Sequence, residues 1–142
     1  MFQWKKGDLM ADKTYTLTFV QQVPRPLPDV FDFFSRAGNL EVLTPPWLNF
    51  KILEVKPQPI RQGTLINYSL RVHGIPLRWT SEIVEWEPPH RFVDLQLRGP
   101  YKLWRHEHRF EPRDGGTLIS HTINLALPLG FLGQFAYRIK VQ

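Results

Sequence analysis

The chain has 142 residues, a length suited to one domain of ordinary size, and its 42% hydrophobic and 22% charged residues are typical of a globular protein. It contains no cysteine, which excludes disulfides, thiolate nucleophiles and cysteine metal ligands. No segment approaches the roughly 18 apolar residues of a membrane span. The N-terminus lacks the apolar run of a secretory signal, so we expect a cytoplasmic location.

The net charge of +5 raises the question of nucleic-acid binding. The basic residues are scattered and interleaved with acidic ones, as in Arg105, Glu107, Arg109 and Glu111. No block of Lys and Arg and no nucleic-acid motif is visible. The pattern therefore favours a solvated face of mixed charge and no nucleic-acid partner.

The N-terminal part of the chain predicts a leader followed by a strand. Residues 1–13 are polar and aperiodic, and we expect a flexible leader ahead of a single domain that spans 14–142. Residues 14–22 (TYTLTFVQQ) alternate and are rich in Thr, Val and aromatic side chains, which predicts the first strand of this domain.

Two short helices are expected next. The first helix is indicated by the spacing i, i+3, i+4, i+7, which predicts an apolar face made of Val30, Phe33, Phe34 and Ala37. The second helix begins near Asn39 and ends before Pro45 and Pro46, because the residue before a proline avoids helical geometry.

From residue 49 onward the sequence predicts strands joined by short turns. Alternating segments are separated by turn residues such as Gly, Pro and Asp, and the last five segments form an antiparallel meander. The six segments are 49–55, 64–72, 77–86, 91–97, 101–112 and 117–127.

The last residues, 129–142, return to helical spacing. The order of strand, two helices, six strands and helix predicts an α+β fold, in which a curved antiparallel sheet of six to seven strands wraps around the C-terminal helix. At ~1.5 Å per residue this helix is at most about 20 Å long. Apolar surface beyond it favours a homodimer or an open groove centred on its apolar face, which comprises Leu132, Phe135, Ala136 and Ile139.

The turn at residues 113–116 sets the register of the last two strands. It places Pro112 opposite Thr117, and the side chains then alternate between the two faces of the sheet. One face is mostly apolar and is predicted to point inward. Its opposite pairs are Phe110 with Ile119, His108 with His121, His106 with Ile123, and Trp104 with Leu125. The other face carries Arg105, Glu107, Arg109, Ser120, Thr122 and Asn124.

Three histidines, His106, His108 and His121, thus project into the predicted interior. They can be buried rings satisfied by hydrogen bonds, polar anchors and acid/base groups in a ligand pocket, or the ligands of a zinc-type ion. No carboxylate has an assured inward direction and no motif such as HExxH is present. We therefore expect no metal and no cofactor.

The strand 64–72 offers a further candidate. Tyr68 shares a strand face with Ile66 and Leu70, which favours an inward ring whose hydroxyl can donate into a pocket. In the next strand, Glu82 and Glu85 leave open which of them faces a cavity, because both faces of that strand carry apolar residues.

Three strings carry a resemblance to a known family: NLEVLTPPWLNFKIL, IPLRWTSEIVEWEPPHRFVDLQLRGPYKLWRHEHRFEP and GGTLISHTINLALPLG. With them the chain resembles the START-like (SRPBCC) superfamily, which has the helix-grip fold and includes polyketide cyclases, lipid-transfer domains and a pollen-allergen family. The strings lie within about residues 14–133 and are similar to a bacterial branch described as polyketide cyclase/dehydrase-like, mostly without assigned activity.

The chain departs from this branch at three points. There, the position of His121 usually holds an acid and that of Leu125 usually an aromatic residue, so pocket chemistry is not transferred whole. Relatives also have a longer terminal helix, which would fit a truncated chain here.

We therefore expect an internal cavity that binds a hydrophobic or aromatic small molecule, such as a lipid, an isoprenoid or a polyketide-like compound. One alternative is a cyclase/dehydrase-type enzyme without a covalent nucleophile, in which His106, His108 or His121 acts as acid or base. Another is an interaction module that docks a protein partner beside the C-terminal helix. The expected ligand-binding residues are Tyr68, Trp104, His106, His108, Phe110, His121, Ile123 and Phe135.

Overall fold

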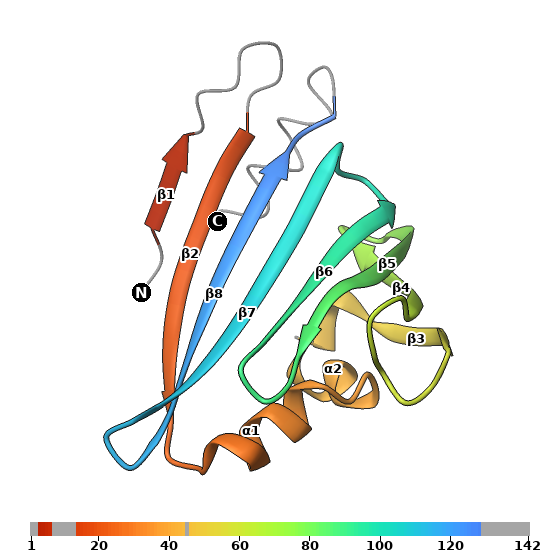
Figure 1. Cartoon of the computed structure of the whole chain (residues 1–142). Helices are drawn as coiled ribbons and strands as arrows, with labels where there is room; N and C mark the ends of the chain where they lie inside the picture. Colours follow the sequence, from red (N-terminus) through yellow and green to blue (C-terminus); the bar gives the residue numbers. More distant parts are fainter. Residues whose placement is uncertain (1–2, 7–13, 45, 129–142) are drawn as a thin grey trace.

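The computed structural model describes residues 3–6, 14–44 and 46–128, and these residues form one antiparallel sheet of eight strands. Figure 1 shows that the sheet is curved. The strand order is β1-β2-β8-β7-β6-β5-β4-β3. The strands are β1 (Gln3–Lys6), β2 (Thr14–Val23), β3 (Lys51–Lys56), β4 (Leu65–Val72), β5 (Ile75–Glu87), β6 (Arg91–Arg98), β7 (Leu103–Arg113) and β8 (Gly116–Ala126).

The predicted strands are all present, and one more is added. β2 to β8 correspond to the seven segments expected from the alternation, whereas β1 lies within the expected leader and pairs with β2. A strand of four residues is too short for an alternation of apolar and polar residues to be recognised in the sequence. Its place in the sheet depends on pairing with β2, the strand that would otherwise form the edge. The predicted C-terminal helix lies outside the described residues, as do Phe135 and the expected dimer or partner surface.

Short helices connect β2 to β3. They are α1 (Leu27–Phe34), α2 (Gly38–Leu43) and the 3-10 turn η1 (Pro46–Leu48), and α1 and α2 lie beside one end of the sheet (Figure 1). In α1, Pro28 stands in the first turn, where its missing N–H is tolerated, and Asp29 meets the positive end of the helix.

The buried face of α1 differs from the predicted one. Phe31 is buried, whereas Phe33 is 38% exposed, and Ala37 lies beyond the helix end. The helix begins one turn earlier than the predicted stripe, so the same spacing keeps Val30 and Phe34, as predicted, and selects Leu27 and Phe31 in place of Phe33 and Ala37. Its inward side chains are Leu27, Val30, Phe31 and Phe34.

We call the sheet face against which α1 packs the inner face. Two clusters of buried side chains cover it, and they form the core of the described part of the chain. The first cluster joins α1 to the sheet and comprises Val30, Phe31, Ile66, Ile83, Phe92, Phe110 and Ile119. The second comprises Leu17, Trp79, Tyr101, Trp104, Ile123 and Leu125.

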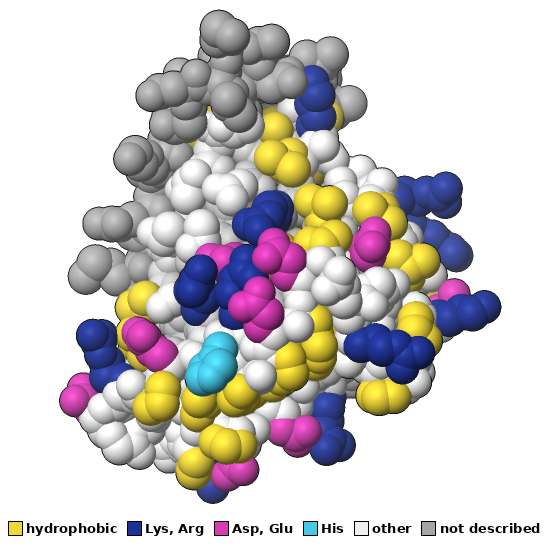
Figure 2. Space-filling model, viewed as in Figure 1, with side chains coloured by type: hydrophobic (Ala, Val, Ile, Leu, Met, Phe, Trp, Pro, Cys, Tyr) yellow, Lys and Arg dark blue, Asp and Glu magenta, His cyan; other side chains and the backbone are white. Residues whose placement is uncertain are grey.

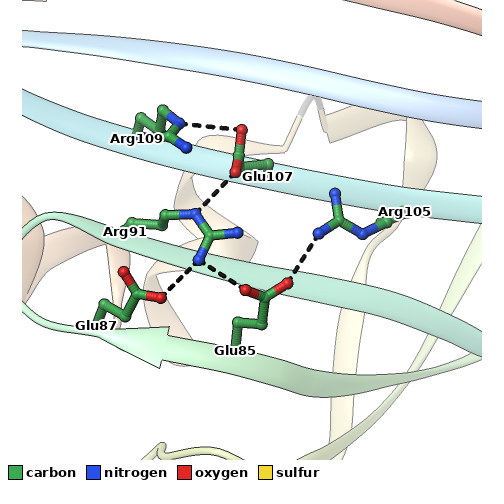
Figure 3. Close-up of polar contacts among 6 residues, drawn as sticks. All are labelled: Glu85, Glu87, Arg91, Arg105, Glu107 and Arg109. Atoms are coloured by element: carbon green, nitrogen blue, oxygen red, sulfur yellow. Dashed lines mark hydrogen bonds and ion pairs between the residues drawn. The ribbon is translucent and has the colours of Figure 1, made fainter.

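The opposite, outer face carries paired charges over β5, β6 and β7. Basic and acidic side chains gather at the centre of the surface seen in Figure 2, and Figure 3 shows six of them in one network. Arg91 lies at its centre and contacts Glu85, Glu87 and Glu107 at 2.7, 2.7 and 2.8 Å. Arg105 and Arg109 extend the network to either side at 2.8 and 3.1 Å. This is the mixed-charge face that the sequence predicts.

Candidate functional site

The register of β7 and β8 confirms the predicted inward set. Cα partners include His108 with His121 and His106 with Ile123, and the turn between the strands contains Asp114 and Gly115. Both turn residues have positive φ, as a type I′ hairpin turn requires. The inward side chains are buried apart from that of His106, which is partly buried.

A cavity of about 250 Å³ lies between the inner face of the sheet and the segment from α1 to η1. Most of its wall is made of aromatic and aliphatic side chains, which suits an apolar ligand. The rings that line it are Phe34, Phe50, Tyr68, Trp79, Trp86, Phe92 and Trp104. The polar side chains of its sheet wall are Ser81, Asp94, His106 and His108.

The predicted ligand-binding residues fall into two groups. Tyr68, Trp104, His106 and His108 line the cavity. Phe110, His121 and Ile123 share the inner face and are buried, but they are not among the residues that line the cavity. Neither Glu82 nor Glu85, the two glutamates whose direction the sequence left open, lines the cavity. Glu85 joins the outer network, and Glu82 is not among the lining residues.

Sequence reasoning missed two polar residues of the site, Ser81 and Asp94. Asp94 is the ionisable one of the two. It lies on β6 opposite His106, and its Oδ2 is 2.7 Å from Nε2 of His108. The Asp94 side chain is 20% exposed and lines the cavity, while that of His108 is 10% exposed. An inward carboxylate is therefore present, although no carboxylate has an assured inward direction from the sequence.

His108 is held by rings as well as by this hydrogen bond. It stacks on Phe92, with ring centroids 4.1 Å apart, and on His106, with centroids 3.7 Å apart. Stacking fixes the plane of the imidazole, and the bond to Asp94 fixes its rotation within that plane. His108 is thus oriented by its neighbours before any ligand arrives.

His121 is linked to this group from β8. Its Nδ1 lies 3.0 Å from Nε2 of His106, and its ring stacks on Phe19 with centroids 4.3 Å apart. Among the described residues, no hydrogen-bond partner reaches Nδ1 of His108 or Nε2 of His121, and both atoms are buried. Two imidazole nitrogens in the interior therefore have unused bonding capacity.

Burial sets the charge state of the group. It lowers the pKa of His121 to about 4, and the negative charge of Asp94 opposes this shift only in part. Burial also lowers the pKa of His108 well below its ordinary value and raises that of Asp94. At neutral pH both imidazoles are uncharged, and one proton lies between Oδ2 of Asp94 and Nε2 of His108.

Tyr68 and Ser81 provide a second polar spot in the cavity wall. The two hydroxyl oxygens are 3.5 Å apart. Burial raises the pKa of Tyr68, so its hydroxyl keeps its proton and can donate to a ligand. Tyr68 is therefore an inward aromatic residue with a polar tip, as its strand position predicts.

Comparison with known proteins identifies the class. Residues 23–141 match the family of polyketide cyclase / dehydrase and lipid transport proteins, and the chain belongs to this family. The family is of the SRPBCC type, and its structural neighbours here share the helix-grip fold. No curated protein matches the chain.

Solved structures agree with this assignment. Ms6760 from Mycobacterium smegmatis has a TM-score of 0.65 at 17% identity, covering 99% of this chain and 88% of its own. CalU16 from Micromonospora echinospora has a TM-score of 0.58 at 15% identity, covering 88% and 69%. Major latex-like protein 151 from Panax ginseng has a TM-score of 0.62 at 12% identity, covering 80% and 79%. Identities this low establish the fold alone.

In the part of the chain that the structure describes, no helix is long and apolar enough to span a membrane.

Proposed function

We propose that the chain binds a hydrophobic or aromatic small molecule in the cavity between the sheet and the segment from α1 to η1. The observation that carries the proposal is a wall of aromatic and aliphatic side chains interrupted by a few polar groups. Membership of a family described by cyclase, dehydrase and lipid-transport functions supports it.

The volume of the cavity restricts the ligand. At about 250 Å³ it exceeds the ~150 Å³ that accommodates benzene in an engineered apolar cavity, and it falls just short of the ~300–1,000 Å³ of drug-sized ligand sites. A molecule with one or two rings, or a short isoprenoid, fits this space. A hydroxyl or carbonyl on that ligand can reach Tyr68 or the Asp94–His108 pair.

A filled cavity tests the proposal. Trp79, Trp86 and Trp104 line the space, so binding of 1-naphthol, a two-ring phenol, should quench the tryptophan fluorescence of the protein. Ser81→Leu places a larger side chain in the wall, and we expect affinity to fall at least ~10-fold, equivalent to about 1.4 kcal/mol.

The matched control is Ser120→Leu, which makes the same change on the outer side of β8 and should leave affinity unchanged. Native mass spectrometry of freshly purified protein would identify a natural ligand that remains bound. Equal 1-naphthol affinity in the two variants, or no saturable quenching in the wild type, would contradict the proposal.

The Asp94–His108 hydrogen bond favours a second candidate, an enzyme of the cyclase/dehydrase type. A carboxylate that lines a cavity and is backed by an imidazole can take a proton from a carbon next to a carbonyl. Such chemistry needs positioning and no covalent nucleophile.

Exchange of the methyl protons of acetophenone with D₂O, followed by NMR, measures this activity. We expect wild type to accelerate the exchange and both Asp94→Asn and His108→Gln to abolish the acceleration. His90→Gln, an exposed turn residue, serves as the control. If the wild-type protein binds acetophenone but the methyl protons exchange at the uncatalysed rate, the enzyme candidate is wrong and the binding function alone remains.

A further inference from the structure

The three inward histidines converge on a small volume. His106 and His108 come from β7 and His121 from β8, and each ring offers one nitrogen such that the three nitrogens lie within 4.8 Å of one another. Ligand nitrogens of a tetrahedral zinc ion lie roughly 3.4 Å apart, given Zn–N distances of ~2.0–2.1 Å. Rotation of the His106 and His121 side chains toward the fixed ring of His108 can close the remaining difference.

The hydrogen bonds of the cluster leave lone pairs inside it. When Nδ1 of His121 donates in the 3.0 Å contact with Nε2 of His106, Nε2 of His121 keeps a free lone pair, whereas the lone pair of His106 accepts this hydrogen bond and reaches an ion only when the contact opens. Nδ1 of His108 and Nε2 of His121 are buried and have no hydrogen-bond partner among the described residues. Buried polar atoms normally have a partner, so the arrangement is incomplete without one.

Asp94 stands where a metal site needs a carboxylate. Imidazoles that bind metals commonly donate their second nitrogen to a carboxylate, which fixes the tautomer and makes the other nitrogen a better ligand. Nε2 of His108 lies 2.7 Å from Asp94, which leaves Nδ1 for a metal ion. The expectation of no metal rested on the lack of a carboxylate with an assured inward direction and on the lack of a metal motif such as HExxH, and Asp94 removes the first of these two grounds.

We propose that His106, His108 and His121 bind one divalent transition-metal ion of the zinc class, with Asp94 orienting His108 from behind. His106, His108 and Asp94 line the cavity, so the fourth coordination position faces the space proposed for the ligand. Three protein ligands and one open position are the arrangement of catalytic rather than structural zinc sites. A ligand with a carbonyl or hydroxyl oxygen could then bind through that oxygen.

Cobalt(II) provides a visible probe for this site. We expect protein stripped with EDTA to bind one equivalent of Co²⁺ with the intense absorption of four-coordinate cobalt, and Zn²⁺ to displace it. His106→Gln and His121→Gln should each weaken binding at least ~100-fold, and Asp94→Asn about 10–100-fold, the range for partners of metal-bound histidines. His90→Gln, outside the cluster, should bind as wild type does.

His121→Asp replaces one ligand atom by another and guards against variants that fail to fold. It should retain Co²⁺ with an altered spectrum. The inference is overturned if wild type shows no four-coordinate spectrum, or if His106→Gln and His121→Gln bind Co²⁺ as tightly as wild type. A water molecule on the two unpaired nitrogens would produce the first result.

The proposed metal site and the proposed small-molecule binding can be contradicted independently of each other. 1-Naphthol quenching in EDTA-treated protein reports on the apolar cavity alone, whereas the cobalt spectrum reports on the histidines. The acid/base role of the Asp94–His108 pair does compete with the metal, because a bound ion would take the lone pair of His108. Acetophenone exchange measured before and after addition of Zn²⁺ distinguishes the two roles.

Discussion

The two faces of β7 carry ionisable side chains in opposite physical states. His106 and His108 point inward, whereas Arg105, Glu107 and Arg109 alternate with them and point outward, where Figure 3 shows them in the ion-pair network. Outside, the charges are paired in contact with water. Inside, burial holds the imidazole of His108 neutral, because a buried charge loses its hydration.

Alternate positions of one strand thus hold charged side chains paired in water and a buried, uncharged imidazole. Exposed ion pairs contribute only ~0–1 kcal/mol each, because water and salt screen them. A buried polar atom without a partner costs about 1–3 kcal/mol, and a removed buried ring costs more. Neighbouring positions on β7 should therefore respond very differently to substitution, and this contrast can be tested from the largest effect to the smallest.

The largest effect is expected at Phe110, which is 2% exposed and packs on Phe31 with ring centroids 5.2 Å apart. Phe110→Ala should lower the free energy of unfolding by about 3–5 kcal/mol, because it removes buried apolar surface and leaves a cavity. Glu111→Ala, the next residue and exposed, should change it by less than ~0.5 kcal/mol. Urea unfolding of both variants checks this, and similar losses would mean that the faces are not distinct.

The next effect concerns pH and the neutral state of His121. Its pKa is about 4 in the folded protein and about 6.5 when unfolded, so between these values the unfolded chain binds more protons. The contribution of neutral His121 to the free energy of unfolding is therefore fully present above pH 6.5 and is lost as the pH falls to about 4. The total loss is on the order of 3 kcal/mol.

Asp94 acts with the opposite sign, because its pKa is raised in the folded protein. The useful measurement is therefore the difference between wild type and His121→Gln, both free of metal, in urea unfolding from pH 7 to pH 4. The variant should lose less stability over this window. Parallel curves for the two proteins would show that His121 does not titrate as a buried group.

An intermediate effect is expected at Arg91, the best-buried member of the outer network. Its side chain is 13% exposed and contacts three carboxylates, but the side chains of Glu85 and Glu87 are 40% and 59% exposed. Arg91→Met should lower the free energy of unfolding by about 1–2 kcal/mol, the low end for hydrogen bonds to charged groups. Arg98→Met, exposed on the same strand, is the control. Equal thermal melting of the two variants would contradict this expectation.

Sequence reasoning succeeded where turn chemistry and alternation agree. Asp114 and Gly115 favour a tight turn, and only one face of β7 and β8 is apolar, so a single register buries that face. The same reasoning failed for Asp94, because both faces of β6 carry apolar residues. Val93 points to the outer face and is nonetheless 0% exposed, since it pairs with Glu107 at the outer network. Alternation in β6 therefore gives no direction.

The cavity itself could be predicted only in part. The inward residues of β7 follow from the register. Phe34, in contrast, reaches the cavity from α1, and Phe50 reaches it from the residues before β3. No periodicity in the sequence predicts where these two segments lie against the sheet. The partners of His108 likewise depend on a diagonal contact between β6 and β7. Such contacts require knowledge of the pairing between strands as well as the pattern within each strand.

The smallest effect is expected at Arg109, the outward neighbour of Phe110. Its guanidinium contacts Glu107 at 3.1 Å, but its side chain is 60% exposed, so water and salt screen the pair. Arg109→Gln keeps the length and polarity of the side chain and removes the charge, and we expect a loss of less than ~0.5 kcal/mol at low salt. The difference from wild type should disappear at high ionic strength, where the Debye length shrinks to a few ångströms (~3 Å at 1 M). Urea unfolding at two salt concentrations measures both numbers. A loss above ~1 kcal/mol that persists in salt would show that the outer network acts as a unit in holding β6 to β7, and the two faces would then contribute comparably to the stability of the sheet.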